Sequence, residues 1–556
     1  MLNQIPVSLK NTRLWVIVLL LCNLTLSLAS LHKKGETGDE KYHLKYGLAY
    51  LSGHPERSEY FMDSKMPISA LNALPAYLSS RISKETTFNV ASGIKQGRYI
   101  TPLFSLLFCF YIFIWSKKLY GVNGSILSLI LAVFAPNMLA HSNLVTTDVF
   151  CATAILIASY YFWKFYNQPN KKNAIISVIA LATSQLVKYT CIYLFLIFFA
   201  IAFIRFLRGC AKQEPEKLGG YVNNSIKPFL LYVLSVFFAF IIIVNIGFQF
   251  HKTGTPLKQY TFRSELFKSI QNIPILNSIP MPLPVAYIDG MDWVSFNEKT
   301  GVSYSNIYLL GKLKYKTANF TGFKNYYTIA YLYKEPLANI VLFSWAIIFA
   351  IINFKKFKFF DNELFLAVPI LFFWIYFNYF FNAQIGIRFF IVVLPFIYIF
   401  CGCILKTNWK GKIIPATILI TWSIISVLSY FPLYISYFNE LVGKRMNSYK
   451  ILADSNLHWG ENYGRLDEYR KQHPEVIFEP DSPRPGKIIV EVNWLVGVYQ
   501  PLKFKWLRDN FKPVDHIAYS FLVYDVTIPQ LQKMKWNPKQ DLLEAMQELG
   551  VVPKNQ

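Results

Sequence analysis

Long apolar stretches recur through this chain and limit what it can fold into. A helix needs about 20 apolar residues to cross roughly 30 Å of hydrocarbon, and a spanning segment must satisfy its backbone hydrogen bonds internally. Only 16% of the residues are charged and 54% are hydrophobic, against about 25% charged in ordinary soluble domains. We therefore expect a mainly α polytopic membrane protein with about 11 transmembrane helices, at 14–31, 100–116, 124–140, 148–166, 173–187, 189–207, 229–250, 337–353, 363–381, 387–404 and 411–433.

Positive charge is distributed unevenly between the short loops. Alternate loops hold Lys117, Lys118, Lys164, Lys171, Lys172, Arg205, Arg208, Lys212, Lys217, Lys227, Lys355, Lys356, Lys358, Lys406, Lys410 and Lys412. The loops between them are nearly free of Lys and Arg, with Lys188 as an exception. Basic loops face the cytoplasm, which predicts a cytoplasmic N-terminus and an extracytoplasmic, periplasmic C-terminus in the cell inner membrane. Because this asymmetry explains most of the net charge of +24, no nucleic-acid partner is expected.

The first apolar stretch has two interpretations. Lys10 and Arg13 precede it, and the small residues Ser27, Ala29 and Ser30 end it as in a signal-peptide cleavage site. Its apolar run of about 18 residues is longer than the 7–15 of an ordinary signal core. A retained helix is favoured, and the rest of the topology is the same in either case.

Three polar blocks separate or follow the spans, at 32–99, 251–336 and 434–556. The first two are expected as outside loops of a transmembrane domain over 1–433, and the third as a C-terminal extracytoplasmic domain. Helical spacing of apolar residues predicts an amphipathic helix over 67–80, lying either in the membrane interface or on the protein. Aromatic residues fill 251–336 without a long helical period, so we expect an ordered loop. The β-like runs 487–494 and 518–527, with a polar helix at 541–549, predict a small α/β domain.

The sequence offers few features of a metal or nucleotide site. The seven cysteines all lie in expected helices or in a cytoplasmic loop, so the outside blocks have neither a disulfide framework nor a Cys metal site. The histidines lack the spacing of metal ligands, and there is no phosphate loop or dinucleotide glycine fingerprint. We expect neither a metal nor another cofactor.

Acidic residues stand where expected helices meet the outer face. Asp39 and Glu40 follow the first apolar stretch, and Asp148 ends the short turn between the spans 124–140 and 148–166. Carboxylates at membrane boundaries are costly to keep without a function, although a solvated loop charge and a helix N-cap are the simpler alternatives. Cations on the same face suit a lipid phosphate; they are Lys65, Arg98, Lys334 and Arg388.

The order of these motifs resembles the polyprenyl-phosphate-dependent glycosyltransferases of the membrane GT-C type, the group of protein O-mannosyltransferases and lipid A aminoarabinose transferases. The resemblance rests on Asp39-Glu40, Lys65-Met66-Pro67, Thr147-Asp148, Lys334-Glu335-Pro336, Arg388 before Leu394-Pro395, and the stretches 437–443 and 452–460. Two departures stand out. His458-Trp459-Gly460-Glu461 replaces the usual Asp-Trp-Gly-Gln, so no catalytic role is assigned there, and Met66 replaces a proline.

The resemblance implies an inverting sugar transfer from a polyprenyl-phosphate donor, within the membrane lipid, to a protein, lipid A or envelope glycan. Asp39 would be the general base, with Glu40 beside it and Asp148 orienting the acceptor or the sugar. Arg388 would hold the donor phosphate, with Lys65, Arg98 and Lys334 as further candidates. A transporter or flippase is the alternative class, although no internal repeat is apparent. A binding or assembly role of the C-terminal domain is a third.

Overall fold

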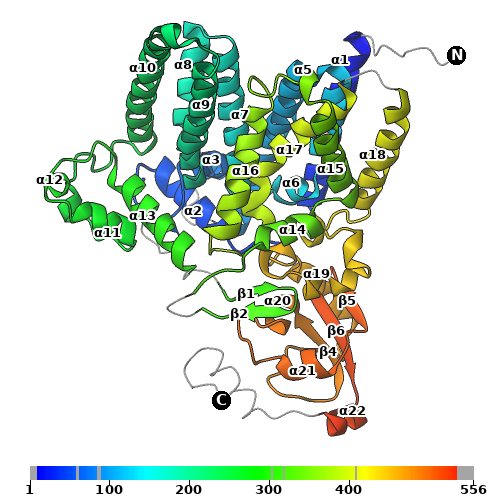
Figure 1. Ribbon diagram of the computed structural model, residues 1–556. Coiled ribbons are helices and arrows are strands. Elements are labelled where there is room, and N and C mark those ends of the chain that lie inside the picture. Colours follow the sequence, from blue (N-terminus) through cyan, green and yellow to red (C-terminus); the bar gives the residue numbers. More distant parts are fainter. Residues whose placement is uncertain are drawn as a thin grey trace, which may run out of the picture.

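The computed structural model describes residues 9–57, 62–83, 89–301, 305–316, 320–406 and 410–534. Long helices fill the upper part of the molecule, and a small domain with a β-sheet lies below them (Figure 1). The helices are α1 Leu9–Leu31, α2 Glu40–Leu51, α3 Ser69–Ser83, α4 Val90–Gly97, α5 Thr101–Val133, α6 Pro136–His141, α7 Asp148–Asn167, α8 Lys171–Ser184, α9 Tyr193–Cys210, α10 Pro215–Gly247, α11 Glu265–Gln271, α12 Pro274–Asn277, α13 Val285–Thr300, α14 Tyr326–Lys334, α15 Leu337–Ile352, α16 Leu364–Tyr379, α17 Leu394–Cys401, α18 Ile413–Leu428, α19 Tyr463–Gln472, α20 Val492–Leu495, α21 Lys505–Asn510 and α22 Ile528–Lys533.

The expected membrane helices have counterparts in the structure. Within the described residues, six helices are long and apolar enough to cross a membrane by length and composition. α14 and α15 together form a further candidate span that is bent by 113°, and α16 and α18 are shorter apolar helices. A mainly helical, multi-pass membrane protein is confirmed, whereas the count of about 11 spans stays a prediction.

α5 is two helices joined at Gly121. The backbone of Gly121 is not helical, with φ of 78° and ψ of −171°, a conformation that glycine adopts without a Cβ penalty. The hydroxyls of Ser116 and Ser128 lie 2.9 Å apart, although 12 residues of straight helix would separate them by about 18 Å. The chain therefore folds back at Gly121, as predicted for two spans at 100–116 and 124–140.

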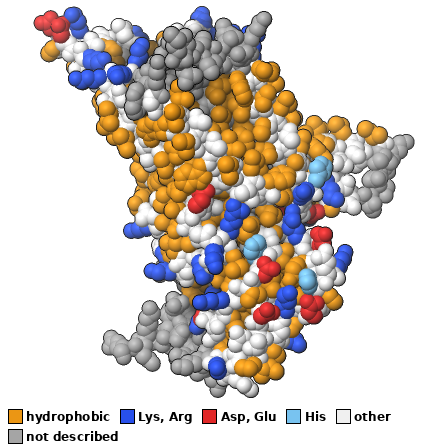
Figure 2. Space-filling view, turned by 90° about the vertical axis from the view of Figure 1, so that its right-hand side faces the viewer, with side chains coloured by type: hydrophobic (Ala, Val, Ile, Leu, Met, Phe, Trp, Pro, Cys, Tyr) orange, Lys and Arg blue, Asp and Glu red, His pale blue; other side chains and the backbone are white. Residues whose placement is uncertain are grey.

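Lipid-facing side chains support the membrane assignment. Figure 2 shows a broad hydrophobic band across one face of the molecule, with most charged side chains toward its two ends. On α18, at the right-hand side of Figure 1, Ile414, Ile418 and Ile425 are exposed by 70%, 61% and 62%. Soluble proteins rarely expose so much contiguous apolar surface, so this face is built to contact hydrocarbon.

The segments 32–99 and 251–336 differ in how well the sequence predicts their helices. The amphipathic helix expected over 67–80 is confirmed as α3, which packs against α2 and α4. The prediction of a loop over 251–336 is wrong for much of its length, because α11, α12, α13 and α14 lie there. α13 has little helical periodicity since its buried residues, among them Ala286, Tyr287, Gly290 and Asp292, surround it on several sides.

The C-terminal segment contains a four-stranded sheet of order β3-β4-β6-β5. The strands are β3 Ile477–Phe478, β4 Gly486–Glu491, β5 Asp515–Ile517 and β6 Phe521–Val526. β4 and β6, the two strands predicted from the sequence, pair antiparallel at the centre. A hairpin of β1 Ile307–Leu309 and β2 Lys312–Lys314 reaches this part through a bridge between Leu309 and Leu452. The helix expected at 541–549 lies outside the described residues, and the domain boundary at 433 stays a prediction.

Candidate active site

Asp39 and Arg388 form the ion pair around which the site is built. Asp39 directly precedes α2, and Arg388 lies in the 3-10 helix η5, Ile387–Val393. One Nη of Arg388 donates to Oδ2 of Asp39 at 2.7 Å. The Asp39 side chain keeps 32% of its surface exposed, and that of Arg388 keeps 8%. Residues separated by 349 positions in the sequence therefore meet at one accessible carboxylate.

Neighbouring cations set the charge state of Asp39. Burial by itself would raise the pKa of the Asp39 carboxyl, but the charges of Arg388 and Lys65 outweigh it and lower that pKa to about 2. Burial lowers the pKa of Lys65, and Asp39 and Asp148 oppose that shift. Lys65, just before α3, therefore belongs to the same cluster.

Asp148 is held by a cation that the sequence analysis did not select. Its Oδ1 accepts a hydrogen bond from Nζ of Lys188 at 2.6 Å, and its Oδ2 lies 4.0 Å from Nδ1 of His141. Asp148 is the first residue of α7 and only 3% exposed, so the helix N-terminus also favours its negative charge. Burial lowers the pKa of His141 to about 3. Lys188 could have been found as the exception to the loop charge pattern.

The stretch 452–461 contacts the Arg388 guanidinium and the backbone just before it. Asn456 Oδ1 accepts a hydrogen bond from the backbone N–H of Ile387 at 2.9 Å, and the Ser455 hydroxyl donates to the carbonyl of Ile385 at 2.8 Å. The guanidinium carbon of Arg388 lies 4.1 Å from the ring centroid of Trp459, a cation–π contact. The stretch 452–461, one of the motifs that carry the family resemblance, therefore positions the Arg388 cation and has no assigned catalytic role.

The same stretch also fixes the chain just before Asp39. The N–H of Gly38 donates to the carbonyl of Trp459 at 3.1 Å, and a Cβ at Gly38 would lie 3.4 Å from Nε1 of Trp459. The N–H of Gly35 donates to the carbonyl of Glu461 at 2.7 Å. The stretch 452–461 is thus hydrogen-bonded to the backbone close to both Asp39 and Arg388.

Glu40 and Arg98 pair with each other away from the Asp39 cluster. Arg98 Nε donates to Glu40 at 2.7 Å, and a second nitrogen of Arg98 donates to the other carboxylate oxygen. The backbone N–H groups of Thr37 and Val145 also donate to Glu40, both at 2.9 Å. The side chains are 0% and 3% exposed. This pair joins three segments of chain and leaves no open side for a substrate.

Lys334 is likewise occupied inside the protein. Its Nζ donates to the carbonyls of Ile435 and Asn456, at 2.7 Å and 2.5 Å, and it is 1% exposed. The structure therefore brings Asp39, Lys65, Asp148 and Arg388 into one cluster and adds Lys188. It places Glu40, Arg98 and Lys334 in supporting contacts.

Three cations and three acids contribute to this cluster. Arg388, Lys65 and Lys188 are the cations, and Asp39 and Asp148 are two of the acids. Asp454 is the third acid, because its charge acts on both Arg388 and Asp39, and burial raises its pKa to about 6. An anionic ligand would therefore have to compete with these carboxylates for the cations. Among the described residues, no three or more His, Cys, Asp and Glu side chains are grouped as metal ligands.

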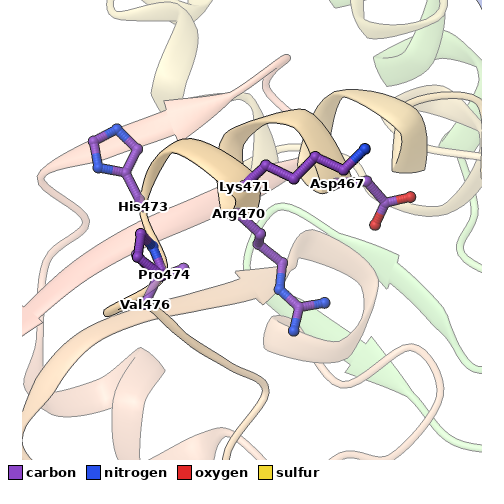
Figure 3. Close-up of a pocket in the computed structure, with 6 residues that line it drawn as sticks. All are labelled: Asp467, Arg470, Lys471, His473, Pro474 and Val476. Atoms are coloured by element: carbon purple, nitrogen blue, oxygen red, sulfur yellow. The ribbon is translucent and has the colours of Figure 1, made fainter.

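A separate hollow lies on the C-terminal domain. Asp467, Arg470, Lys471, His473, Pro474 and Val476 line it (Figure 3). Arg470 and His473 point to different sides in this view, and His473 is engaged by Glu475 at 3.3 Å. Its polar side chains do not converge on one point, so we assign it no catalytic role.

Known proteins resemble parts of this chain. No curated protein matches it by sequence. Among solved structures, ArnT from Cupriavidus metallidurans bound to undecaprenyl phosphate is 10% identical, with a TM-score of 0.46, covering 93% of this chain and 98% of ArnT. The Archaeoglobus fulgidus oligosaccharyltransferase AglB, in complex with an inhibitory peptide and a dolichol-phosphate, is 12% identical, with a TM-score of 0.46, covering 81% of this chain and 60% of AglB.

A family model supplies the more direct comparison. The model described as dolichyl-phosphate-mannose-protein mannosyltransferase matches residues 88–223. This segment includes Arg98, Asp148 and Lys188 and excludes Asp39 and Arg388. The match confirms the resemblance of this multi-pass membrane protein to the GT-C glycosyltransferases of the protein mannosyltransferase type.

Proposed function

We propose that the protein transfers a sugar from a polyprenyl-phosphate donor to an acceptor hydroxyl at the outer face of the cytoplasmic membrane. The observation that supports this best is the Asp39–Arg388 pair: a partly exposed carboxylate joined to a guanidinium at 2.7 Å. A base and a phosphate-binding cation are the two groups that such a transfer needs. The family match over 88–223 supports a lipid-phosphate sugar as donor.

The proposed reaction is a single displacement. The acceptor oxygen attacks the anomeric carbon and forms the new glycosidic bond, while the bond from that carbon to the phosphate oxygen breaks. The electron pair leaves with the phosphate, and the acceptor proton moves to Asp39. One displacement inverts the anomeric configuration. A positioned base contributes about 10²–10⁴-fold in rate.

The low pKa of Asp39 raises a question for its role as base, because a good general base has a pKa near the working pH. The Arg388 charge is one cause of that low pKa. A donor phosphate can take the two parallel N–H donors of Arg388 and so compete with Asp39 for the same cation. Donor binding would then release Asp39, and its pKa would rise toward the working range.

Lys188 and Asp148 have a positioning role in this proposal. The Asp148 side chain is 3% exposed and that of Lys188 is 20% exposed, so the Lys188 ammonium is the more accessible of the two groups. Asp148 holds Lys188 in place, and Lys188 with Lys65 adds positive charge near the departing phosphate. The Glu40–Arg98 pair is hydrogen-bonded to the backbone just before Asp39 and so fixes the position of that segment.

The test is sugar transfer by the purified full-length protein. Radiolabelled sugars on synthetic polyprenyl phosphates are incubated with a membrane extract of acceptors, and wild type is compared with Asp39→Asn. Transfer is expected for wild type only, with an inverted anomeric centre in the product. Lys45→Gln, a charge change on the same helix α2, is the matched control and is expected to keep transfer.

Two outcomes would contradict the proposal. Full transfer by a folded Asp39→Asn protein would remove Asp39 from the role of base. No transfer from any donor, with the protein intact, would favour the transporter alternative, for which the bend between α14 and α15 would be the feature to test.

A further inference from the structure

A second group of cations lies across the membrane region from Asp39. α9 begins five residues after Lys188 and ends at Cys210. Between Tyr193 and Arg208 a helix rises about 22 Å at 1.5 Å per residue. The far end of α9 and its connection to α10 lie at the top of Figure 1, away from the C-terminal sheet. By the charge pattern this is the cytoplasmic face.

Aromatic side chains wall a cavity at this end, between α7, α9 and α10. The cavity has a volume of about 630 Å³, within the usual range for a small-molecule site. Phe162, Phe165, Phe199, Phe203 and Tyr232 are among its lining residues. Phe199 and Phe203 are exposed by 56% and 49%, so this wall of the cavity faces the hydrocarbon.

The polar part of the cavity is positively charged. Arg205, Arg208 and Lys212 line it, and Asp361 is the one acidic residue among its described lining residues. Arg205 lies 3.1 Å from Asp361, so these two charges compensate. The guanidinium carbon of Arg208 lies 3.9 Å from the ring centroid of Phe360. Arg208 and Lys212 therefore provide the excess positive charge.

We propose that this cavity binds one anionic phospholipid of the bilayer. Its phosphate would lie between Arg208 and Lys212, and an acyl chain would follow Phe199 and Phe203 along α9. A basic pocket between helices on the cytoplasmic side is suited to an anionic headgroup. The aromatic walls need an apolar partner, which a free phosphate does not supply. This lipid is distinct from the sugar donor, whose proposed site is at the other membrane face.

Native mass spectrometry of the purified full-length protein tests the proposal. Phosphatidylglycerol and phosphatidylcholine are titrated separately onto wild type, Arg208→Gln/Lys212→Gln and the matched control Lys217→Gln/Lys227→Gln. The control removes the same charge from α10, at two residues that do not line the cavity. Thermal unfolding of each variant checks that it is folded.

Wild type is expected to bind one phosphatidylglycerol in preference to phosphatidylcholine. The Arg208→Gln/Lys212→Gln protein should lose this affinity by roughly 30-fold, and the control by less than about threefold. Equal losses in both double variants, or none in either, would overturn the proposal. Competition by glycerol 3-phosphate as strong as that by the lipid would also overturn it, because the acyl chain would then contribute nothing.

Discussion

Two neighbouring acids, Asp39 and Glu40, end in opposite environments. Each pairs with an arginine, but Asp39 keeps 32% of its side-chain surface exposed, whereas Glu40 keeps none. Adjacent residues at a helix start point about 100° apart, so one faces the open cluster and the other faces the protein. The comparison separates an ion pair that a substrate can open from one that holds the structure together.

Hydrogen bonding makes the same distinction. Arg98 donates to Glu40 and also to the carbonyls of Lys34 and Gly35, at 3.1 Å and 2.6 Å. Arg388 donates to Asp39, whose carboxylate stays partly exposed, and its guanidinium lies over the Trp459 ring. A guanidinium that holds several backbone carbonyls and a fully buried carboxylate is committed to the fold. A guanidinium whose carboxylate partner is reached by solvent can exchange that partner.

Removing the buried carboxylate is the largest expected effect on stability. Glu40→Gln leaves Arg98 buried without its counter-charge, which costs about 3–5 kcal/mol. Asp39→Asn is the matched control and should cost less, because Asp39 keeps 32% of its side-chain surface exposed and water can reach the pair. Chemical unfolding in detergent measures both. Equal losses would show that the two pairs do not differ as described.

Replacing each arginine by lysine should separate binding from folding. Arg388→Lys keeps the charge but loses the two-pronged geometry, so the KM for the donor should rise about tenfold or more. Arg98→Lys should lower thermal stability and leave the KM of the folded protein within about threefold. Steady-state transfer kinetics and thermal unfolding are measured on both variants. A larger kinetic effect from Arg98→Lys would reverse the assignment.

The ring of Trp459 should matter less than the charge that it supports. Trp459→Leu removes a cation–π contact worth about 0.5–1 kcal/mol, so the donor KM should rise about two- to fivefold. Trp459→Phe keeps an aromatic face and should recover most of the loss. Trp494→Leu removes another ring beside a cation, Lys503, and is the matched control. A donor KM that does not respond to Trp459→Leu would remove this residue from the site.

Glu298 sharpens the comparison because its carboxylate is bonded to tyrosines and not to an arginine. It accepts hydrogen bonds from Tyr193 and Tyr376, and burial raises its pKa to about 7 from 4.5. The folded state binds this proton more tightly, so stability should fall as pH rises from about 4.5 to 7. Glu298→Gln should flatten this part of the stability curve. If Glu298→Gln had the same pH dependence of stability as wild type, the raised pKa of Glu298 would be contradicted.

Sequence patterns predicted the helices better than the site contacts. Apolar runs located the long helices, and β4 and β6 correspond to the two β-like runs. The number of spans and the orientation read from the loop charges stay predictions. α13 was missed because burial on several sides removes the helical period. The cluster was expected through the family resemblance, whereas the partners of Asp148 and Glu40 were not. Lys188 and Arg98 are distant in sequence from these acids, and contacts of that kind depend on tertiary packing.

The most direct measurement is donor binding and sugar transfer on the same Asp39→Asn protein. Because Asp39 competes with the donor phosphate for Arg388 in the proposed mechanism, removing the Asp39 charge should leave the Kd for a polyprenyl-phosphate sugar unchanged or lower it. Transfer should nevertheless fall by about 10²–10⁴-fold. Transfer at the wild-type rate, or a Kd that rises as far as transfer falls, would contradict the account.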